Sequence, residues 1–213
     1  MFDAWPIIFD ISRPIRPELP VWPGDPPFEM NWISRMADGD SANIAQLHIG
    51  VHTGTHVDAP RHLLEQGPAV DELILNAFLG KARLVDARGR GVLDVAFINS
   101  VLARSEDAKR ILFRTGAWEA TTGFPTVFPA LEPAAAEALI AAGIRLIGTD
   151  APSVDPLDSL ELPAHHALLA AGIPILENLQ LEEPAFGEYE LIALPLPVTG
   201  ADASPVRAVL RTL

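Results

Sequence analysis

The chain has 213 residues, a length that one domain with a single hydrophobic core can accommodate. About half of the residues are apolar (49%) and 20% are charged, which is typical of a globular protein that folds without disulfides. The formal net charge of −13 and the pI of about 4.7 disfavour binding to nucleic-acid phosphates, and no cluster of lysine and arginine indicates an anionic membrane as partner. We therefore expect one domain over residues 1–213, with no nucleic-acid and no membrane partner.

Cysteine is absent, which excludes disulfides, thiolate nucleophiles and every metal site that needs sulfur. Any bound metal must therefore be held by nitrogen and oxygen. Residues 1–6 lack the basic start and the uninterrupted apolar run of a signal peptide, and no apolar run of about 18 residues predicts a membrane helix. The expected location is the cytoplasm.

The 20 prolines and 15 glycines divide the chain into short segments, which favours many strands over long helices. A proline-rich stretch at residues 14–27 follows the first expected strand, and a turn at residues 37–40 separates the second from the third. In chain order, strands are predicted at residues 6–11, 28–36, 44–51, 82–86, 111–114, 145–149, 173–176, 189–194 and 206–210.

Three helices are predicted among these strands. The first follows Asp94, a candidate N-cap, and its apolar residues have amphipathic spacing at Val95, Phe97, Ile98, Val101 and Leu102. The second begins at Pro133 and ends before Gly143, and the third covers residues 163–171 and ends at Gly172. The chain is thus expected to be a mixed α/β domain with more strand than helix.

Four of the six histidines fall between His48 and His62. Residues 51, 53, 55 and 57 are all β-branched, as an extended strand prefers, so the even positions between them would share the opposite face. That face would carry His52, His56 and Asp58, with Gly54 leaving room between the two imidazoles. Two imidazoles and a carboxylate are a sufficient ligand set for zinc or manganese. The pattern predicts a metal site.

His62 follows Pro60, which ends the regular strand because proline cannot donate a ladder hydrogen bond. An imidazole near the metal, with an unperturbed pKa of about 6.5, suits a general acid/base at neutral pH. The alternative, in which these histidines are only packed or exposed side chains, is disfavoured by their even spacing beside a carboxylate. His48, four residues before His52, is interpreted as solvent-facing or as a side chain that contacts the metal ligands without binding the metal itself.

The remaining histidines, His165 and His166, are adjacent, and Glu177 follows them. Because Asp58 has two carboxylate oxygens, it could bridge two ions. Either histidine could then join Asp58 and Glu177 in a second site, with the ions about 3.5–4 Å apart as in two-metal hydrolases. Spacing alone leaves open whether one metal binds or two, and which histidine takes part.

The stretch from His52 to His62, HTGTHVDAPRH, resembles the motif H-x-G-T/A-H-x-D-A-P-x-H of the cyclase family of metal-dependent hydrolases, which includes bacterial kynurenine formamidase (arylformamidase). Further segments that are similar to this family are residues 21–25, 164–167 with Glu177, 189–196 and 203–210. The resemblance therefore covers nearly the whole chain. It implies a β-rich α/β fold of the swivelling β/β/α type and a zinc-dependent homodimer.

The same resemblance implies roles for individual residues. His52, His56 and Asp58 would bind one metal ion, and Asp58 would also touch a second. His165 would join the second ion and Glu177 would contact both. His62 would donate and accept protons, and Trp22 would line the substrate pocket. The implied cofactor is zinc, two ions per subunit, with manganese as an alternative.

The activity implied by the resemblance is hydrolysis of N-formyl-L-kynurenine to L-kynurenine and formate in tryptophan degradation. The lack of cysteine and of a Gly-x-Ser-x-Gly turn agrees with hydrolysis without a covalent enzyme intermediate. Two alternatives are a related family member that opens another amide, such as isatin, and a metal-binding protein without catalysis. The spare histidine argues against the latter, because a structural metal site is usually closed and needs no further base.

Overall fold

The structure is a computed structural model, and it describes residues 5–105, 107–119 and 123–213. Residues 1–4, part of the segment expected not to be a signal peptide, lie outside this range. Within the described residues, nine strands form one mixed sheet in the order β1-β13-β11-β5-β7-β9-β10-β4-β12. The strands are β1 (Ile8–Asp10), β4 (His56–Asp58), β5 (Leu79–Asp86), β7 (Arg110–Arg114), β9 (Leu146–Thr149), β10 (Ile175–Glu177), β11 (Gly187–Ile192), β12 (Ala203–Pro205) and β13 (Val209–Thr212).

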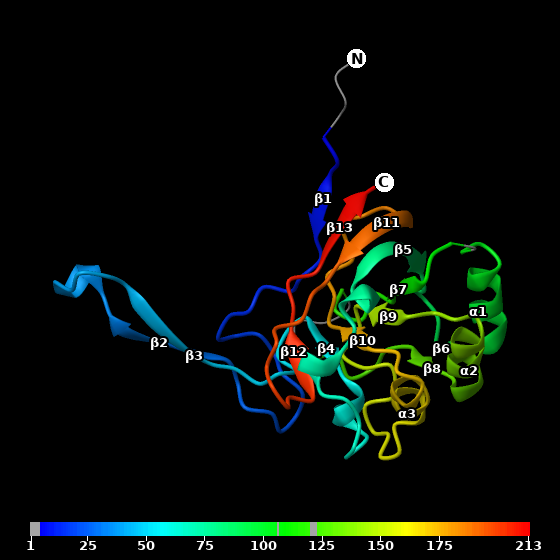
Figure 1. The fold of residues 1–213 in the computed structure, drawn as a ribbon, viewed down its shortest axis with the longest axis horizontal. Coiled ribbons are helices and arrows are strands. Elements are labelled where there is room, and N and C mark those ends of the chain that lie inside the picture. The colour runs from blue at the N-terminus through cyan, green and yellow to red at the C-terminus, as the bar shows by residue number, and fades with distance from the viewer. Residues whose placement is uncertain (1–4, 106, 120–122) are drawn as a thin grey trace.

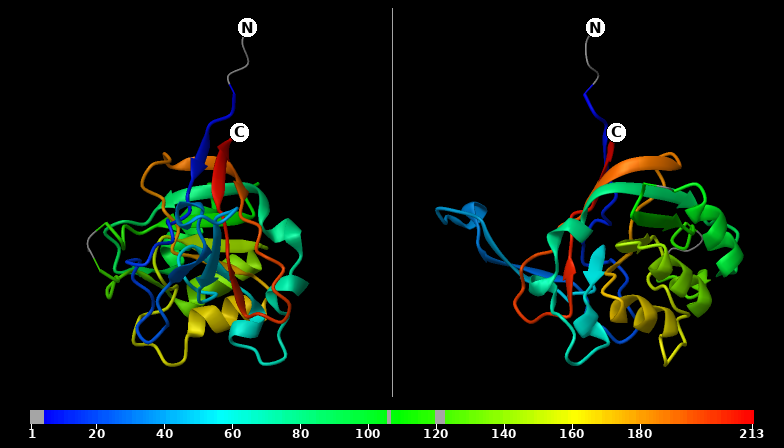
Figure 2. Two further views of the ribbon diagram at one scale, coloured as in Figure 1. Left: turned by 90° about the vertical axis from the view of Figure 1, so that its left-hand side faces the viewer. Right: turned by 45° about the vertical axis from the view of Figure 1, so that its right-hand side comes forward.

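The middle of this sheet is parallel and both of its sides are antiparallel. Strands β5, β7, β9 and β10 run in the same direction, whereas β11, β13 and β1 on one side and β4 and β12 on the other alternate in direction. The sheet curls, and the helices pack on the outer face of its middle strands (Figure 2). The mixed α/β class expected from the sequence is confirmed.

The described residues contain three α-helices, α1 (Val95–Leu102), α2 (Pro133–Ala141) and α3 (Pro163–Ala170), at the positions predicted. Asp94 caps α1 as expected, because its carboxylate accepts a hydrogen bond of 2.7 Å from the backbone N–H of Phe97. The short elements are β6 (Val92–Leu93), β8 (Ala130–Leu131), η1 (Met36–Asp38), η2 (Pro60–His62), η3 (Val70–Glu72) and η4 (Leu75–Ala77). No helix in the described parts of the chain is long and apolar enough to cross a membrane.

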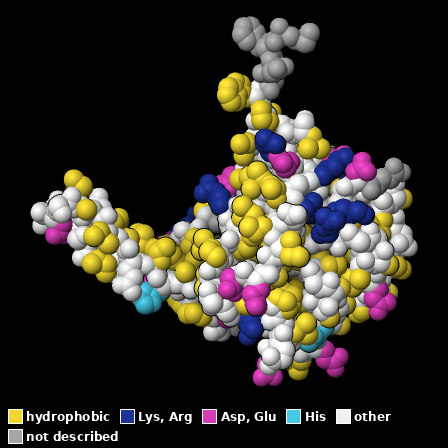
Figure 3. Space-filling view, viewed as in Figure 1, with side chains coloured by type: hydrophobic (Ala, Val, Ile, Leu, Met, Phe, Trp, Pro, Cys, Tyr) yellow, Lys and Arg dark blue, Asp and Glu magenta, His cyan; other side chains and the backbone are white. Residues whose placement is uncertain are grey.

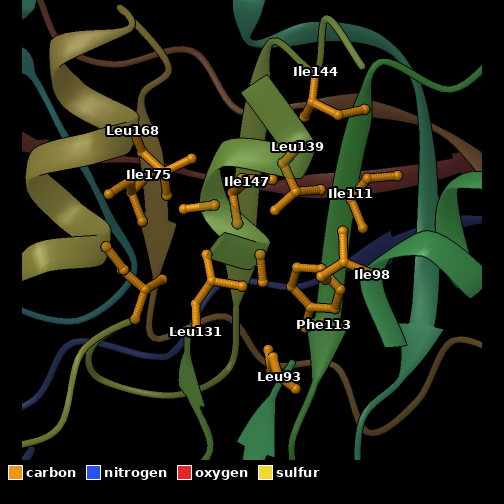
Figure 4. Close-up of a cluster of buried hydrophobic side chains, with 14 of the residues drawn as sticks. Leu93, Ile98, Ile111, Phe113, Leu131, Leu139, Ile144, Ile147, Leu168 and Ile175 are labelled. Carbon is orange, nitrogen blue, oxygen red and sulfur yellow. The ribbon is translucent and has the colours of Figure 1, made fainter. Parts of the chain in front are cut away.

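Alternating side chains of the central strands supply two hydrophobic cores. Ile111 and Phe113 of β7 pack on the helix side (Figure 4), whereas Leu112 between them packs on the opposite side. On β10, Ile175 faces the helices and Leu176 the other core. Strands buried on both faces account for the continuous apolar runs in their sequences.

Strands β2 (Glu29–Ser34) and β3 (Ile44–His48) form a separate antiparallel ladder that projects from the body as an arm (Figure 1). The segment was predicted as two strands joined by a turn, and this is confirmed. Large apolar side chains of the arm are exposed, and Figure 3 shows them along its length. They include Met30, Trp32, Ile33, Met36, Ile44 and Leu47.

Candidate metal centre

The pairing of β4 with β10 places three ligand-type side chains together. His56 lies directly opposite Glu177 in the antiparallel register, and Asp58 lies two residues along the same strand. Residues two apart on a strand share a face, and directly paired residues share it across the ladder. Val57 between them packs in the core away from the helices, so the three polar side chains face the helix side, where all are buried.

The strand predicted through residues 51–58 is wrong in its first part, because residues 51–55 form turns and only His56–Asp58 is extended. Gly54 has a φ of 69°, in the left-handed region that favours glycine. A Cβ at this position would come within 3.2 Å of Cγ1 of Ile15. Gly54 therefore turns the chain rather than leaving room between two ligands, and this turn brings Nδ1 of His52 to 3.0 Å from Oδ1 of Asp58.

Helix α3 contributes a third histidine from its first turn. His165 is buried, and its Nε2 lies 3.6 Å from Oδ2 of Asp58 and 3.2 Å from Oε1 of Glu177. His166, one residue further along the helix, is exposed. Of the two histidines that the sequence left open, the fold thus brings His165 to the carboxylates.

Two groups of potential ligands share Asp58: one with His52 and His56, the other with His165 and Glu177. In each group the ligand atoms lie within 4.8 Å of one another. Among the described residues, the buried polar atoms without a hydrogen-bond partner include Nε2 of His56, both carboxylate oxygens of Asp58 and Oε1 of Glu177. Leaving such atoms unpaired is costly, and lone pairs that converge from nitrogen and oxygen fit a divalent cation.

The outer nitrogen of each ligand histidine is held by an oxygen acceptor. Nδ1 of His56 donates to the carbonyl of Gly54 at 2.9 Å, and Nδ1 of His165 donates to Oδ2 of Asp155 at 2.7 Å. Nε2 of His52 donates to Oδ2 of Asp202 at 3.0 Å. Such bonds are usual for metal-binding histidines, because they set the tautomer that leaves the inner nitrogen free for the ion. Sequence reasoning missed both aspartates.

Asp202 also holds His62, whose Nδ1 lies 3.2 Å from the same Oδ2. An ionised carboxylate only accepts hydrogen bonds, so Nδ1 of His62 donates, and in the neutral ring the lone pair is then on Nε2. His52, His62 and Asp202 form a third group with ligand-type spacing, but here the carboxylate oxygen already accepts from both rings. Their contacts support positioning of His62 rather than a third ion. In the sequence, the only indication for Asp202 was that it directly precedes residues 203–210, a segment that resembles the cyclase family.

Buried carboxylates shape the charge of the cluster. Burial lowers the pKa of His52, but the hydrogen bond to Asp202 and the nearby carboxylate of Asp58 outweigh it and raise the pKa to about 10. Burial likewise opposes the charged form of Asp58, yet the surrounding histidines hold the pKa of that carboxyl well below its usual range. A divalent cation that binds here would therefore displace a proton from His52.

The cluster lies in the wall of a cavity of about 400 Å³, which the ligand histidines and His62 line together with aromatic side chains. Phe124 meets Trp22 edge to face at 5.6 Å between ring centroids, and Trp118 at 5.8 Å. Trp22, which the family resemblance assigns to the substrate pocket, is among the residues that line this cavity. These rings suit a flat aromatic ligand.

His48 lies exposed on the arm, where its Nε2 is 3.1 Å from Nε2 of Gln46, as its solvent-facing interpretation predicted.

The sequence pattern of a protein family described as "Putative cyclase" matches residues 9–156. The chain belongs to the cyclase family. It is 46% identical to a kynurenine formamidase of Salinibacter ruber over 96% of this chain and 97% of the relative. It is 43% identical to a kynurenine formamidase of Geobacillus thermodenitrificans over the whole of both chains. The family resemblance found in the sequence is thus confirmed.

Solved structures of cyclase-like proteins share the fold. A predicted metal-dependent hydrolase from Bacillus stearothermophilus is 28% identical, with a TM-score of 0.80 over 99% of this chain and 100% of that one. Isatin hydrolase A from Labrenzia aggregata, bound to benzyl benzoate, is 25% identical, with a TM-score of 0.82 over 97% and 94%. The curled, β-rich α/β architecture is therefore common to hydrolases of this family.

Proposed function

We propose that the chain is a metal-dependent arylformamidase that hydrolyses N-formyl-L-kynurenine to L-kynurenine and formate in tryptophan degradation. The observation that carries the proposal is the pair of ligand groups that share Asp58 in an aromatic cavity, with His62 beside them. The near full-length similarity to proteins named kynurenine formamidase supports this substrate over isatin.

His52, His56 and Asp58 would hold one zinc ion, and Asp58, His165 and Glu177 a second, while manganese would suit the same donors. When bound, the ions would lower the pKa of water from about 15.7 toward about 7 and polarise the formyl oxygen.

His62 would supply the proton transfers of the reaction. Its Nε2 would accept a proton as water attacks the formyl carbon, and would return it to the anilide nitrogen as the carbon–nitrogen bond breaks. Asp202, bonded to Nδ1, would hold the ring in the tautomer that this transfer needs. Trp22 and Phe124 would hold the aryl ring and keep bulk water away from it.

The test is a metal analysis of the purified protein followed by activity assays. Hydrolysis of formylkynurenine and of isatin would be measured before chelation, after chelation and after zinc is returned. The proposal expects kynurenine to form only when metal is present. Opening of isatin without cleavage of formylkynurenine would favour the related-amide alternative, and bound zinc with neither reaction would favour a non-catalytic metal protein.

Replacing Asp202 by asparagine is expected to lower kcat/KM for formylkynurenine by about 10- to 100-fold, because the outer hydrogen bonds of His52 and His62 lose their anionic acceptor. The fold should persist, since Asp202 is partly exposed. Steady-state kinetics and competition with a chelator would show how the loss divides between proton transfer and metal affinity. Unchanged values of both would contradict the role given to Asp202.

We also propose that the chain forms a homodimer in which the arm of one copy covers the body of the other. A two-stranded ladder alone is only marginally stable in water. The arm also carries apolar side chains that would stay exposed to water in a monomer. The body exposes a matching set near the paired residues Leu79 and Ile192: Ile74, Leu75, Leu79, Leu194, Leu196 and Val198. Because each chain carries both surfaces, a dimer with twofold symmetry can form the same arm-to-body contact twice.

A charge on the arm should then separate the two copies. Replacing Trp32 or Leu47 by glutamate is expected to shift the particle from two chains to one, as measured by light scattering after size-exclusion chromatography. Glu29→Lys is the control, because it replaces one charged residue of the same arm by another. A wild-type protein that runs as a monomer would contradict the dimer, and a Trp32→Glu dimer would contradict the role of the arm.

A further inference from the structure

Arg13 is fixed in the wall of the same cavity, beside the strands that carry the ligands. Its backbone N–H donates to Oγ1 of Thr55 at 2.8 Å, and that hydroxyl donates to the carbonyl of Asn178 at 2.7 Å. Thr55 precedes His56, and Asn178 follows Glu177. Arg13 is therefore anchored to the residues next to two of the ligands.

Two contacts hold the guanidinium of Arg13 in the cavity wall. It lies over the ring of Trp118, 4.2 Å from the ring centre, and its Nη2 donates to the carbonyl of Leu179 at 3.2 Å. Trp118 is itself fixed, because its Nε1 donates to Oδ1 of Asn178 at 3.2 Å. An arginine stacked in this way loses little further freedom when it binds a planar anion.

The charge of Arg13 has no direct counter-ion within the described ranges of the chain, where no carboxylate oxygen lies within 4.0 Å of its nitrogens. Its Nε is enclosed and has no hydrogen-bond partner there. Asp150 and Glu182 act on it only at longer range, and the carboxylate of Asp150 already accepts hydrogen bonds from Thr115 and Gly116. A cation removed from water in this way is costly unless an anion joins it.

We propose that Arg13 binds the α-carboxylate of an amino-acid substrate whose arylformamide is cleaved at the metal cluster. This inference rests on the proposed function and adds a substrate preference to it. The cavity lining contains aromatic rings for an aryl group, ligands for the reacting amide and one guanidinium for a carboxylate. A neutral amide such as isatin would leave that guanidinium without its partner, so the enzyme would prefer arylformamides that carry a carboxylate.

The test compares two substrates that share the reacting group. N-formyl-L-kynurenine has the carboxylate, whereas N-(2-acetylphenyl)formamide has the same aryl ketone and formamide but lacks the whole amino-acid group, and Arg13→Gln isolates the share of the carboxylate. The wild-type enzyme is expected to favour formylkynurenine in kcat/KM by about 10- to 100-fold, the range for a hydrogen bond between charged groups. Arg13→Gln should remove most of that preference, chiefly by raising KM for formylkynurenine, and should lower kcat/KM for the neutral substrate far less.

Two further variants guard against a change that is only structural. Arg13→Lys keeps the charge but not the planar fork, and it should retain part of the preference. Arg88→Gln is the control, because Arg88 also lies over an aromatic ring, Phe186 at 5.2 Å, but pairs with Asp86 and does not line the cavity. It should keep the wild-type ratio. Bound metal and the melting temperature would be measured for each variant.

The outcomes separate the two proposals. Equal losses on both substrates in Arg13→Gln, or a wild-type enzyme with no preference, would overturn the carboxylate assignment and leave the arylformamidase standing. A wild-type enzyme that cleaves neither substrate would overturn both. If Arg13→Gln does not fold, inhibition of the wild-type enzyme decides: L-kynurenine should bind at least about tenfold more tightly than 2-aminoacetophenone, and equal binding would reject the inference.

Discussion

Replacing His56 by alanine is expected to lower kcat/KM for formylkynurenine by about 1000-fold or more and to remove metal from the protein. His56 is buried, and its Nε2 faces Oδ1 of Asp58 at 3.4 Å and Oε2 of Glu177 at 3.6 Å, so its loss would remove a nitrogen ligand that adjoins both carboxylates. Without the ion, water keeps its pKa of about 15.7 and is a poor nucleophile at neutral pH. Elemental analysis and kinetics on the same sample check both parts.

The matched control for this loss is His166→Ala. His166 is also a histidine beside a ligand, but it is exposed on α3 and contributes to none of the three ligand groups. Its variant should keep wild-type metal content and activity. A His56→Ala protein that still binds its full metal and turns over at the wild-type rate would show that the cluster is not the catalytic metal site.

The second large effect is expected for His62→Ala, which should lower kcat by about 100- to 10 000-fold while the metal stays bound. His62 is held by Asp202 at 3.2 Å, and its ring centre lies 4.5 Å from that of His52, beside the cluster but outside the two groups that share Asp58. Its loss would remove the proton carrier and leave the ligands in place. The readouts are kcat, metal content and the melting temperature.

His48→Ala serves as the control, because His48 lies exposed on the arm and should be neutral for turnover. Two results would refute the acid/base role of His62. One is a His62→Ala enzyme with nearly full activity, and the other is an inactive variant that has also lost its metal. The latter would instead support the group of His52, His62 and Asp202 as a cation site.

Local sequence patterns predicted much of the fold, because helix caps, proline and glycine positions and apolar runs act over a few residues. Asp94 and Pro133 correctly mark the starts of α1 and α2, and the arm was found from its two strands and turn. The short strands β6, β8 and β12 were missed, since two or three residues carry too weak a pattern. The alternation along β4 correctly placed His56 and Asp58 on one face.

The same alternation failed for His52, although His52 does reach the site. Its β-branched neighbours favour a strand, but Gly54 at positive φ makes a turn instead, and propensity alone cannot show which preference wins. The choice between His165 and His166 was open for a similar reason. The helix PAHHALLA is apolar around both histidines, so only its packing against α2 and β10 decides which one is buried.

The amino-acid sequence by itself determined the kinds of atoms available: imidazoles and carboxylates without any thiolate, concentrated in one short motif. Only the tertiary structure decided which of them meet. Pairing of β4 with β10 sets His56 opposite Glu177, and the loop before β12 brings Asp202 to His62, 140 residues away in the chain. Such contacts depend on strand order and register, which local propensities do not encode.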